Sequence, residues 1–252
     1  MSTKQGYKIN QLLQNAPRGA VLLSSWLVEQ GYSHALQQKY LRSKWLTPLG
    51  KGAYKRTGDD VGTFGGLYAL QKQAKKSIHI GGPSALYLQG YAHYIAMENQ
   101  ALTLFSAPGL KLPAWFSNHW SDEYKIRRTS FLPADAELVK YDTGSLEIRI
   151  SSPPRAIMEC LELTPEHFEI EEAWLIMESL NTLPPNQVQS LLEQCKSVKT
   201  KRLFLYFAEK ASHAWFKYLD ISRINLGKGK RSIVKNGKFE SKYKITLPEG
   251  LL

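Results

Sequence analysis

Residues 19–56 read GAVLLSSWLVEQGYSHALQQKYLRSKWLTPLGKGAYKR, and this run decides the fold of the N-terminal part of the chain. Its pattern predicts a short helix that ends at Gly31 and a second helix over residues 34–43, capped by Ser33. Two short apolar runs on either side of Lys51 then predict a β-hairpin with a glycine-rich, basic tip. Helix, helix and hairpin in this order are typical of a winged helix-turn-helix, a unit used mainly to bind duplex DNA.

The second helix is predicted to enter the major groove of DNA. Its Leu36 and Tyr40 lie one turn apart and point inward, so Gln38 points outward, flanked by His34 and Arg42. Glutamine pairs with adenine, and arginine pairs with guanine or with a phosphate. The residues predicted to contact DNA are Ser33, His34, Gln37, Gln38, Arg42, Lys44, Lys51, Tyr54, Lys55 and Arg56.

The distribution of charge favours a nucleic-acid partner. Residues 1–58 hold nine basic residues and one acidic residue, and a segment this basic gains free energy from counterion release on meeting phosphates. Residues 196–252 are also strongly basic, whereas residues 161–195 carry seven glutamates and no lysine or arginine, which is typical of a solvated helix face. The alternative for the N-terminal charge is a winged helix that contacts only protein and carries ordinary solubilising lysines.

Length and composition predict two domains in an α+β fold. The 252 residues divide at a polar junction into a winged helix-turn-helix over 1–60 and a second domain over 61–252. We expect the second domain to have a small mixed α/β core over 61–150 and a helical part with a basic tail over 151–252. The predicted strands are 77–80, 100–105, 126–131 and 146–150, and the predicted helices are 64–76, 85–91, 156–161, 170–180 and 187–196.

Several classes of protein are excluded by composition. The chain has no signal peptide and no apolar run that spans a bilayer, which predicts a cytoplasmic protein without a membrane partner. Cys160 and Cys195 lack the spacing of a disulfide framework or a zinc site, and the six histidines form no metal-binding pair. We therefore expect no metal and no cofactor.

A strand followed by Gly81-Gly82 and then a helix suggests the opening of a nucleotidyltransferase. That class of enzyme needs two close carboxylates on the next strand to hold Mg²⁺, and residues 101–106 contain none. We therefore interpret the glycine pair as a tight turn and predict neither a catalytic residue nor an enzymatic activity. In the tail, a basic turn lacks the spacing of a phosphate-binding loop, but its charges are candidates for contact with an anion or a partner: Lys228, Lys230 and Arg231.

Taken together, these motifs resemble one family over nearly the whole chain, the AbiEi-type abortive-infection antitoxins of bacterial type IV toxin–antitoxin systems. The motifs that carry the resemblance are GAVLLSSWL (19–27), KYLRSKWLTPLGKGAY (39–54), IHIGGPSALYLQGYAHY (78–94), SPPRAIME (152–159), KRLFLYFA (201–208), LGKGKR (226–231) and KYKITLP (242–248). The resemblance implies an N-terminal winged helix that represses the promoter of its own operon, and a C-terminal part that counteracts a cognate nucleotidyltransferase toxin in phage defence. We expect the operator to be an inverted repeat.

Two other interpretations remain open at this point. One is a winged-helix transcription factor with a ligand-sensing or dimerisation domain and no toxin partner. The other is a degenerate nucleotidyltransferase-like enzyme. The presence of a nucleotidyltransferase gene beside this one would favour the antitoxin over the plain transcription factor, and turnover of labelled nucleotide would favour the enzyme.

Overall fold

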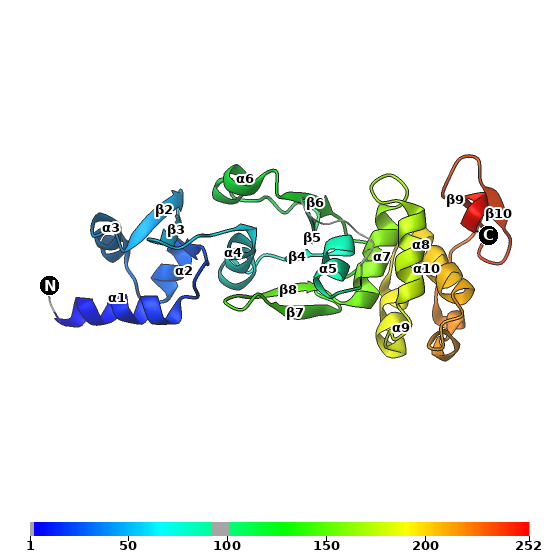
Figure 1. The fold of residues 1–252 in the computed structure, drawn as a ribbon, viewed down its shortest axis with the longest axis horizontal. Coiled ribbons are helices and arrows are strands. Elements are labelled where there is room, and N and C mark those ends of the chain that lie inside the picture. The colour runs from blue at the N-terminus through cyan, green and yellow to red at the C-terminus, as the bar shows by residue number, and fades with distance from the viewer. Residues whose placement is uncertain (1–2, 92–100, 252) are drawn as a thin grey trace.

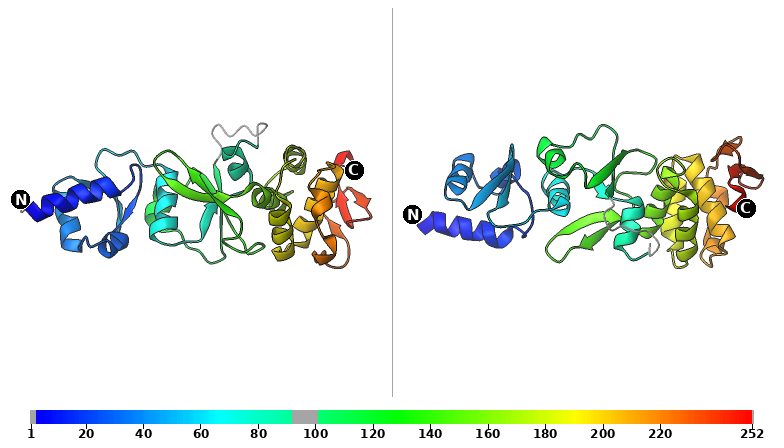
Figure 2. Two further views of the ribbon diagram at one scale, coloured as in Figure 1. Left: turned by 90° about the horizontal axis from the view of Figure 1, so that it is seen from below. Right: turned by 45° about the horizontal axis from the view of Figure 1, so that its top comes forward.

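The structure, a computed structural model, describes residues 3–91 and 101–251, with the side chains of residues 3–7 left out. The described chain forms an elongated molecule with the N-terminus at one end and the C-terminus at the other (Figure 1). An N-terminal part, a sheet-containing middle part and a C-terminal part follow one another along its length, as two further views also show (Figure 2). The fold is a mixed α+β fold with several sheets, as predicted.

The N-terminal part is built from three helices and a small antiparallel sheet, an arrangement consistent with a helix-turn-helix. Its strands lie in the order β1-β3-β2, with β2 and β3 forming the expected hairpin. The first helix, α1, was not predicted. The elements are α1 (Thr3–Asn15), β1 (Leu22–Leu23), α2 (Ser24–Glu29), α3 (His34–Arg42), β2 (Leu46–Gly50) and β3 (Ala53–Arg56).

A separate small core holds these elements together. Leu12 of α1, Leu27 of α2, Tyr40 of α3 and Leu46 of β2 are all buried in it. Because α1 supplies Leu12 and other apolar side chains to this core, tertiary packing stabilises a helix whose sequence is otherwise polar.

The middle part contains a five-stranded mixed sheet in the order β6-β5-β4-β8-β7. The predicted helix over 64–76 is instead α4 followed by a π-helical turn over Ala69–Gln73, and α6 and β7 were not predicted. The remaining predicted strands are present with shifted ends, although Gln100 lies outside the described residues. The elements are α4 (Thr63–Tyr68), β4 (Ile78–Ile80), α5 (Gly82–Leu88), β5 (Leu102–Ser106), α6 (Ala114–Trp120), β6 (Tyr124–Arg128), β7 (Leu138–Asp142) and β8 (Glu147–Ser151).

The C-terminal part is a helical layer followed by a short sheet. Three of its helices, α7, α8 and α9, were predicted with shifted ends, whereas α10 was not predicted. The tail also departs from the prediction of a helical part, because it forms a three-stranded sheet in the order β10-β11-β9. The elements are α7 (Pro153–Leu163), α8 (Ile170–Ser179), α9 (Pro185–Gln194), α10 (Val198–Lys210), β9 (Arg231–Ser232), β10 (Lys238–Glu240) and β11 (Ile245–Leu247), with 3₁₀ turns over Phe216–Tyr218, Ile221–Arg223 and Glu249–Leu251.

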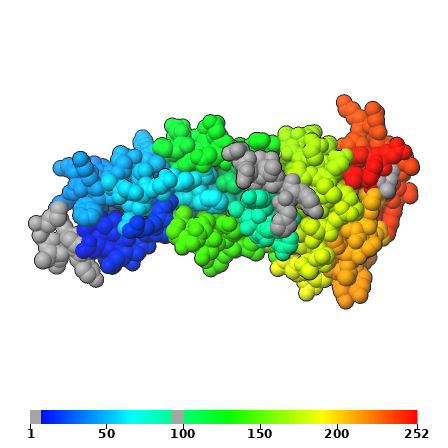
Figure 3. Space-filling model, in the orientation of Figure 1, coloured from blue at the N-terminus to red at the C-terminus, as the bar shows by residue number. Residues whose placement is uncertain are grey.

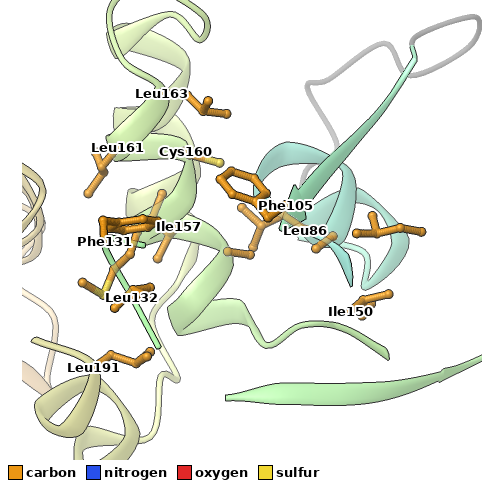
Figure 4. Close-up of a cluster of buried hydrophobic side chains, with 14 of the residues drawn as sticks. Leu86, Phe105, Phe131, Leu132, Ile150, Ile157, Cys160, Leu161, Leu163 and Leu191 are labelled. Carbon is orange, nitrogen blue, oxygen red and sulfur yellow. The ribbon is translucent and has the colours of Figure 1, made fainter. Parts of the chain in front are cut away.

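One large core joins the middle and C-terminal parts. In Figure 4, Phe105 of β5 lies on one side of α7. Phe131 lies on the opposite side of this helix, near Ile157 and Leu161. The same core extends into the N-terminal part through Val21 and other buried residues of its sheet. The N-terminal part therefore packs directly on the middle part, which is also visible in the space-filling view (Figure 3).

Candidate nucleic-acid interface

Helix α3 presents one polar face to solvent. Ser33 caps it as predicted, with its hydroxyl accepting a hydrogen bond from the backbone N–H of Leu36 at 3.4 Å. On the outer face, His34, Gln38 and Arg42 are exposed, as the helical spacing predicts. These three side chains supply amide, imidazole and guanidinium groups of the kind that read base edges in a major groove.

Gln37 does not belong to this exposed face. Its side chain is only 1% exposed, and its amide nitrogen donates to the carbonyls of Ser24 at 3.1 Å and Tyr32 at 2.8 Å. Its amide oxygen accepts from the Ser24 hydroxyl at 2.6 Å. Gln37 was predicted to contact DNA, but the structure places it between α2 and α3, where its hydrogen bonds fix the angle between the two helices.

The three basic residues of the hairpin differ in exposure to solvent. Lys51 is exposed at the tip, next to Gly52, whose φ of 73° is the left-handed conformation that a tight turn requires. Lys55 donates to the carbonyl of Asp59 at 3.1 Å, and Arg56 donates to the carbonyl of Ala16 at the end of α1 at 3.2 Å. These two cations are half-buried and tied to backbone near the base of the hairpin.

Of two further residues predicted to contact DNA, Tyr54 is buried and Lys44 is exposed. Tyr54 is 9% exposed and belongs to the N-terminal core, so the predicted contact of its ring with DNA does not fit its position. Lys44 is exposed and adopts a φ of 56° at the end of α3. Lys44 also lines a groove of about 440 Å³ that holds two further basic residues, Arg18 and Arg56, and one acidic residue, Asp59.

The hairpin also rests on the middle part of the chain, which the sequence did not predict. Gly50 passes so close to α6 that a Cβ at this position would lie 2.7 Å from the Cβ of Trp115. On the other side of the hairpin, Gln73 in the π-helical turn extends the ladder of β1. Its amide oxygen accepts from the N–H of Leu23 at 2.8 Å, and its amide nitrogen donates to the carbonyl of Val21 at 2.7 Å.

The basic turn of the tail is held by a buried arginine. Arg202 of α10 is 2% exposed, and its guanidinium donates to four backbone carbonyls: those of Leu226 at 2.9 Å, Gly227 at 3.3 Å, Gly229 at 2.7 Å and Lys244 at 3.2 Å. Desolvation, with a smaller contribution from the nearby charge of Arg231, lowers the pKa of Arg202.

Arg202 holds the backbone of the turn on its buried side, and the residues predicted to contact an anion or a partner lie on its exposed side. Lys228, Lys230 and Arg231 are all exposed, and the Lys230 ammonium lies 4.7 Å from the ring centroid of Phe239. A cation over an exposed aromatic ring is held by a weak attraction that a charged partner can replace.

The glycine pair of the middle part binds a carboxylate of the protein itself. Glu159 of α7 is fully buried, and its Oε2 accepts from the N–H of Gly82 at 2.8 Å and from the Ser151 hydroxyl at 2.7 Å. Its Oε1 lies 2.9 Å from Nε2 of His79 and accepts from Arg155 at 2.8 Å. The Gly82 N–H that would cradle a nucleotide phosphate is thus already engaged.

The charge of Glu159 is strongly stabilised in this position. Burial by itself would raise the pKa of its carboxyl, but the facing His79 and Arg155 and the Ser151 hydroxyl lower that pKa to about 2. The tight strand-to-helix turn predicted from the sequence is therefore fastened by an ionised internal group.

Two family models match the chain. Residues 5–97 match the transcriptional regulator, AbiEi antitoxin N-terminal domain, and residues 99–248 match the transcriptional regulator, AbiEi antitoxin, type IV toxin–antitoxin system. Among solved structures, the chain is similar to the crystal structure of the RV2827C protein from Mycobacterium tuberculosis, with a TM-score of 0.62 and 12% identity over 97% of this chain and 91% of that one. That identity is low enough for the likeness to show only the fold. No curated protein matches the chain. Among the described residues, no helix is long and apolar enough to cross a membrane.

Proposed function

Because the chain belongs to the AbiEi family of type IV toxin–antitoxin transcriptional regulators, we propose that it represses its own operon and counteracts a cognate nucleotidyltransferase toxin. The observation that carries the DNA-binding half is the exposed polar face of α3 beside the basic tip of the hairpin. In this proposal residues 1–60 act as a winged helix-turn-helix, and residues 61–252 act as the antitoxin part.

The DNA contacts divide between α3 and the hairpin. Helix α3 lies in the major groove, where His34, Gln38 and Arg42 meet base edges, with Ser33 at the end that enters first. Lys51 at the hairpin tip meets a phosphate. Lys44, Lys55 and Arg56 add positive charge beside the backbone, while the buried Gln37 and Tyr54 hold the shape of the unit. Two copies of the chain bind the two halves of an inverted repeat.

The tail supplies the contact with the toxin or with an anion that the toxin uses. Lys228, Lys230 and Arg231 are exposed on a turn that Arg202 holds in place, so the backbone of the turn is already ordered before binding. An acidic surface is the complementary partner for such a turn. The protein acts in this account by binding, and the occupied glycine turn at Glu159 supports that interpretation over nucleotidyl transfer.

A pair of cellular assays tests both halves with the full-length chain. Truncation is avoided because Val21 and Leu23 are buried in the main core, so removal of residues 1–60 would expose apolar surface. One assay measures repression of a reporter behind the chain's own promoter. The other measures growth during co-expression of the nucleotidyltransferase that we expect to be encoded beside it.

Two variants should fail in different assays. Arg42→Ala should lose repression and keep growth rescue, because its side chain lies on the outer face of α3. A triple variant with Lys228→Gln, Lys230→Gln and Arg231→Gln should keep repression and lose rescue. A control of equal charge loss at exposed positions outside the tail sheet, with Lys125→Gln, Lys140→Gln and Lys217→Gln, should keep both. A wild-type chain that neither represses nor rescues contradicts the proposal.

A further inference from the structure

The tail sheet has an inner face that joins the main core and an outer face on the opposite side. Ile245 and Leu247 of β11 are fully buried and belong to the core, so Thr246 between them points to the outer face. In the register of the sheet, Thr246 pairs with Phe239 of β10 and with Ser232 of β9. Because paired residues of neighbouring strands share a face, these three side chains lie together on the outer face.

An aromatic ring is the largest group on this outer face. Phe239 is 41% exposed, in contrast to the buried apolar residues of the inner face. Lys230 lies two residues before Ser232, and its ammonium is 4.7 Å from the centroid of the Phe239 ring. The outer face therefore presents a flat apolar ring with a cation directly beside it.

Positive charge surrounds the ring. Residues 226–247 contain seven basic residues and one acidic residue, Glu240. The Glu240 carboxylate is already engaged, because its oxygens accept from two backbone N–H groups at 2.6 and 2.9 Å. Within the described residues, the side chains of Lys228 and Lys230 form no hydrogen bond or ion pair. These cations are complementary to the phosphates of an external ligand.

The outer face of the tail sheet is remote from the recognition helix. In Figure 1, β9 and β10 lie at the C-terminal end of the elongated molecule, and α3 lies at the N-terminal end. The five-stranded sheet and the helical layer lie between them. The ring and its cations therefore form a contact surface separate from the one that we propose for the operator.

We infer that this outer face binds a single-stranded nucleic acid, with one base stacked on Phe239 and phosphates beside Lys228 and Lys230. The inference rests on the proposed function, in which the tail contacts the toxin or an anion that the toxin uses, and it identifies that anion. Aromatic rings on a sheet face, flanked by cations, bind single strands because every base offers a flat surface for stacking. A duplex is a poorer ligand, since its bases are already stacked on one another. The hydroxyls of Ser232 and Thr246 lie on the same face, where they can bond to a base edge or to a 2′-hydroxyl.

The experiment measures binding of the full-length chain to fluorescently labelled oligo(U) and oligo(dT), each of about 12 nucleotides. Excess unlabelled promoter duplex is present to occupy α3. The test variant is Phe239→Ala. The matched control is Tyr218→Ala, because Tyr218 is also exposed and has the Lys217 ammonium 5.0 Å from its ring, but it lies outside the tail sheet.

Loss of one stacked base should weaken strand binding by Phe239→Ala about 5-fold to 150-fold. Phe239→Trp should retain wild-type affinity or exceed it, and Tyr218→Ala should bind as the wild type does. Lys230→Gln should reduce the slope of log affinity against log salt by about 0.7, the value for one phosphate contact on a single strand. Comparison of the two strands shows whether the 2′-hydroxyl contributes to binding.

A photochemical cross-link places the base directly. 5-Iodouracil, built into the strand, cross-links under ultraviolet light to an aromatic ring that stacks on it. Mass spectrometry of the digested complex should find the cross-link at Phe239. A cross-link confined to the N-terminal part would contradict the inference.

The outcomes separate this inference from the proposed function. If the wild-type chain binds neither strand, or if Phe239→Ala binds as the wild type does, the inference is wrong. Loss of growth rescue in the triple tail variant would then leave the proposed function intact, with an acidic surface of the toxin as the partner. Strand binding that depends on Phe239, together with full rescue by the triple variant, would support the inference and contradict the proposed role of the tail.

Discussion

Two adjacent glutamines on α3 should behave in opposite ways when each is replaced by alanine. Gln37 is buried between α2 and α3, and its amide donates two hydrogen bonds to carbonyls and accepts one from Ser24. Gln38 is exposed on the outer face of the same helix. The pair is a matched comparison, because the residue type, the helix and the substitution are the same.

The magnitude follows from the hydrogen bonds that Gln37 makes. Each is worth about 1 kcal/mol net, and the carbonyls of Ser24 and Tyr32 lose their amide donor when the side chain is removed. Gln37→Ala should therefore destabilise the N-terminal part by about 3 kcal/mol. Gln38→Ala should change stability by no more than about 0.5 kcal/mol and weaken operator binding by about 1–3 kcal/mol.

Hydrogen exchange is the appropriate assay for stability, because it reports on α2 and α3 separately from the rest of the chain. Gln37→Ala should accelerate exchange throughout α2 and α3, and Gln38→Ala should leave exchange unchanged. Binding to the promoter duplex is measured in parallel. Loss of sequence preference in Gln37→Ala, with normal exchange rates, would refute the structural role and would mean that this side chain reads a base.

The other predictions concern a buried charge and a close contact. The folded-state pKa of Glu159, lowered from 4.5 to about 2, makes its ionised form stabilising above pH 4.5, by about 3 kcal/mol, and this contribution is lost as the pH falls toward 2. Unfolding measured from pH 5 to 2 should therefore show a steeper loss of stability in the wild type than in Glu159→Gln, and equal slopes would contradict the buried ion pairs. Gly50→Ala should cost about 1–3 kcal/mol because its Cβ meets Trp115, whereas Gly62→Ala, with no atom within 4 Å of the new Cβ, should cost less in the same thermal unfolding measurement. If both substitutions cost the same, the hairpin does not rest on α6.

The elements that the sequence predicted well are those with strong local signals. Helix α3 has its serine cap and its apolar spacing within ten residues, and the hairpin has a glycine pair around Lys51. The exposure of His34, Gln38 and Arg42 on the outer face of α3 could be predicted from helical geometry alone. Gln37 lies at the edge of that face, where geometry does not decide, and its burial depends on Ser24 and Tyr32 of the preceding helix and turn.

The features that were missed depend on partners far apart in the chain. The tail sheet has strands of two and three residues, too short to show alternation, and it is held by Arg202, which bonds carbonyls 24 to 42 residues away. The occupied glycine turn depends on Glu159, 77 residues beyond Gly82. The contact between the hairpin and α6 joins Gly50 to Trp115, 65 residues later, so it could not be predicted from local pattern either.

Helix α3 is proposed to read a specific operator through its outer face. The most direct measurement is the affinity of the full-length chain, at about 150 mM salt, for the duplex upstream of its own gene and for the same duplex with its inverted repeat scrambled. We expect the native duplex to bind at least about a thousandfold more tightly, and Arg42→Ala to remove most of this preference. Equal affinity for the two duplexes, or a preference that Gln38→Ala and Arg42→Ala both leave intact, would contradict it.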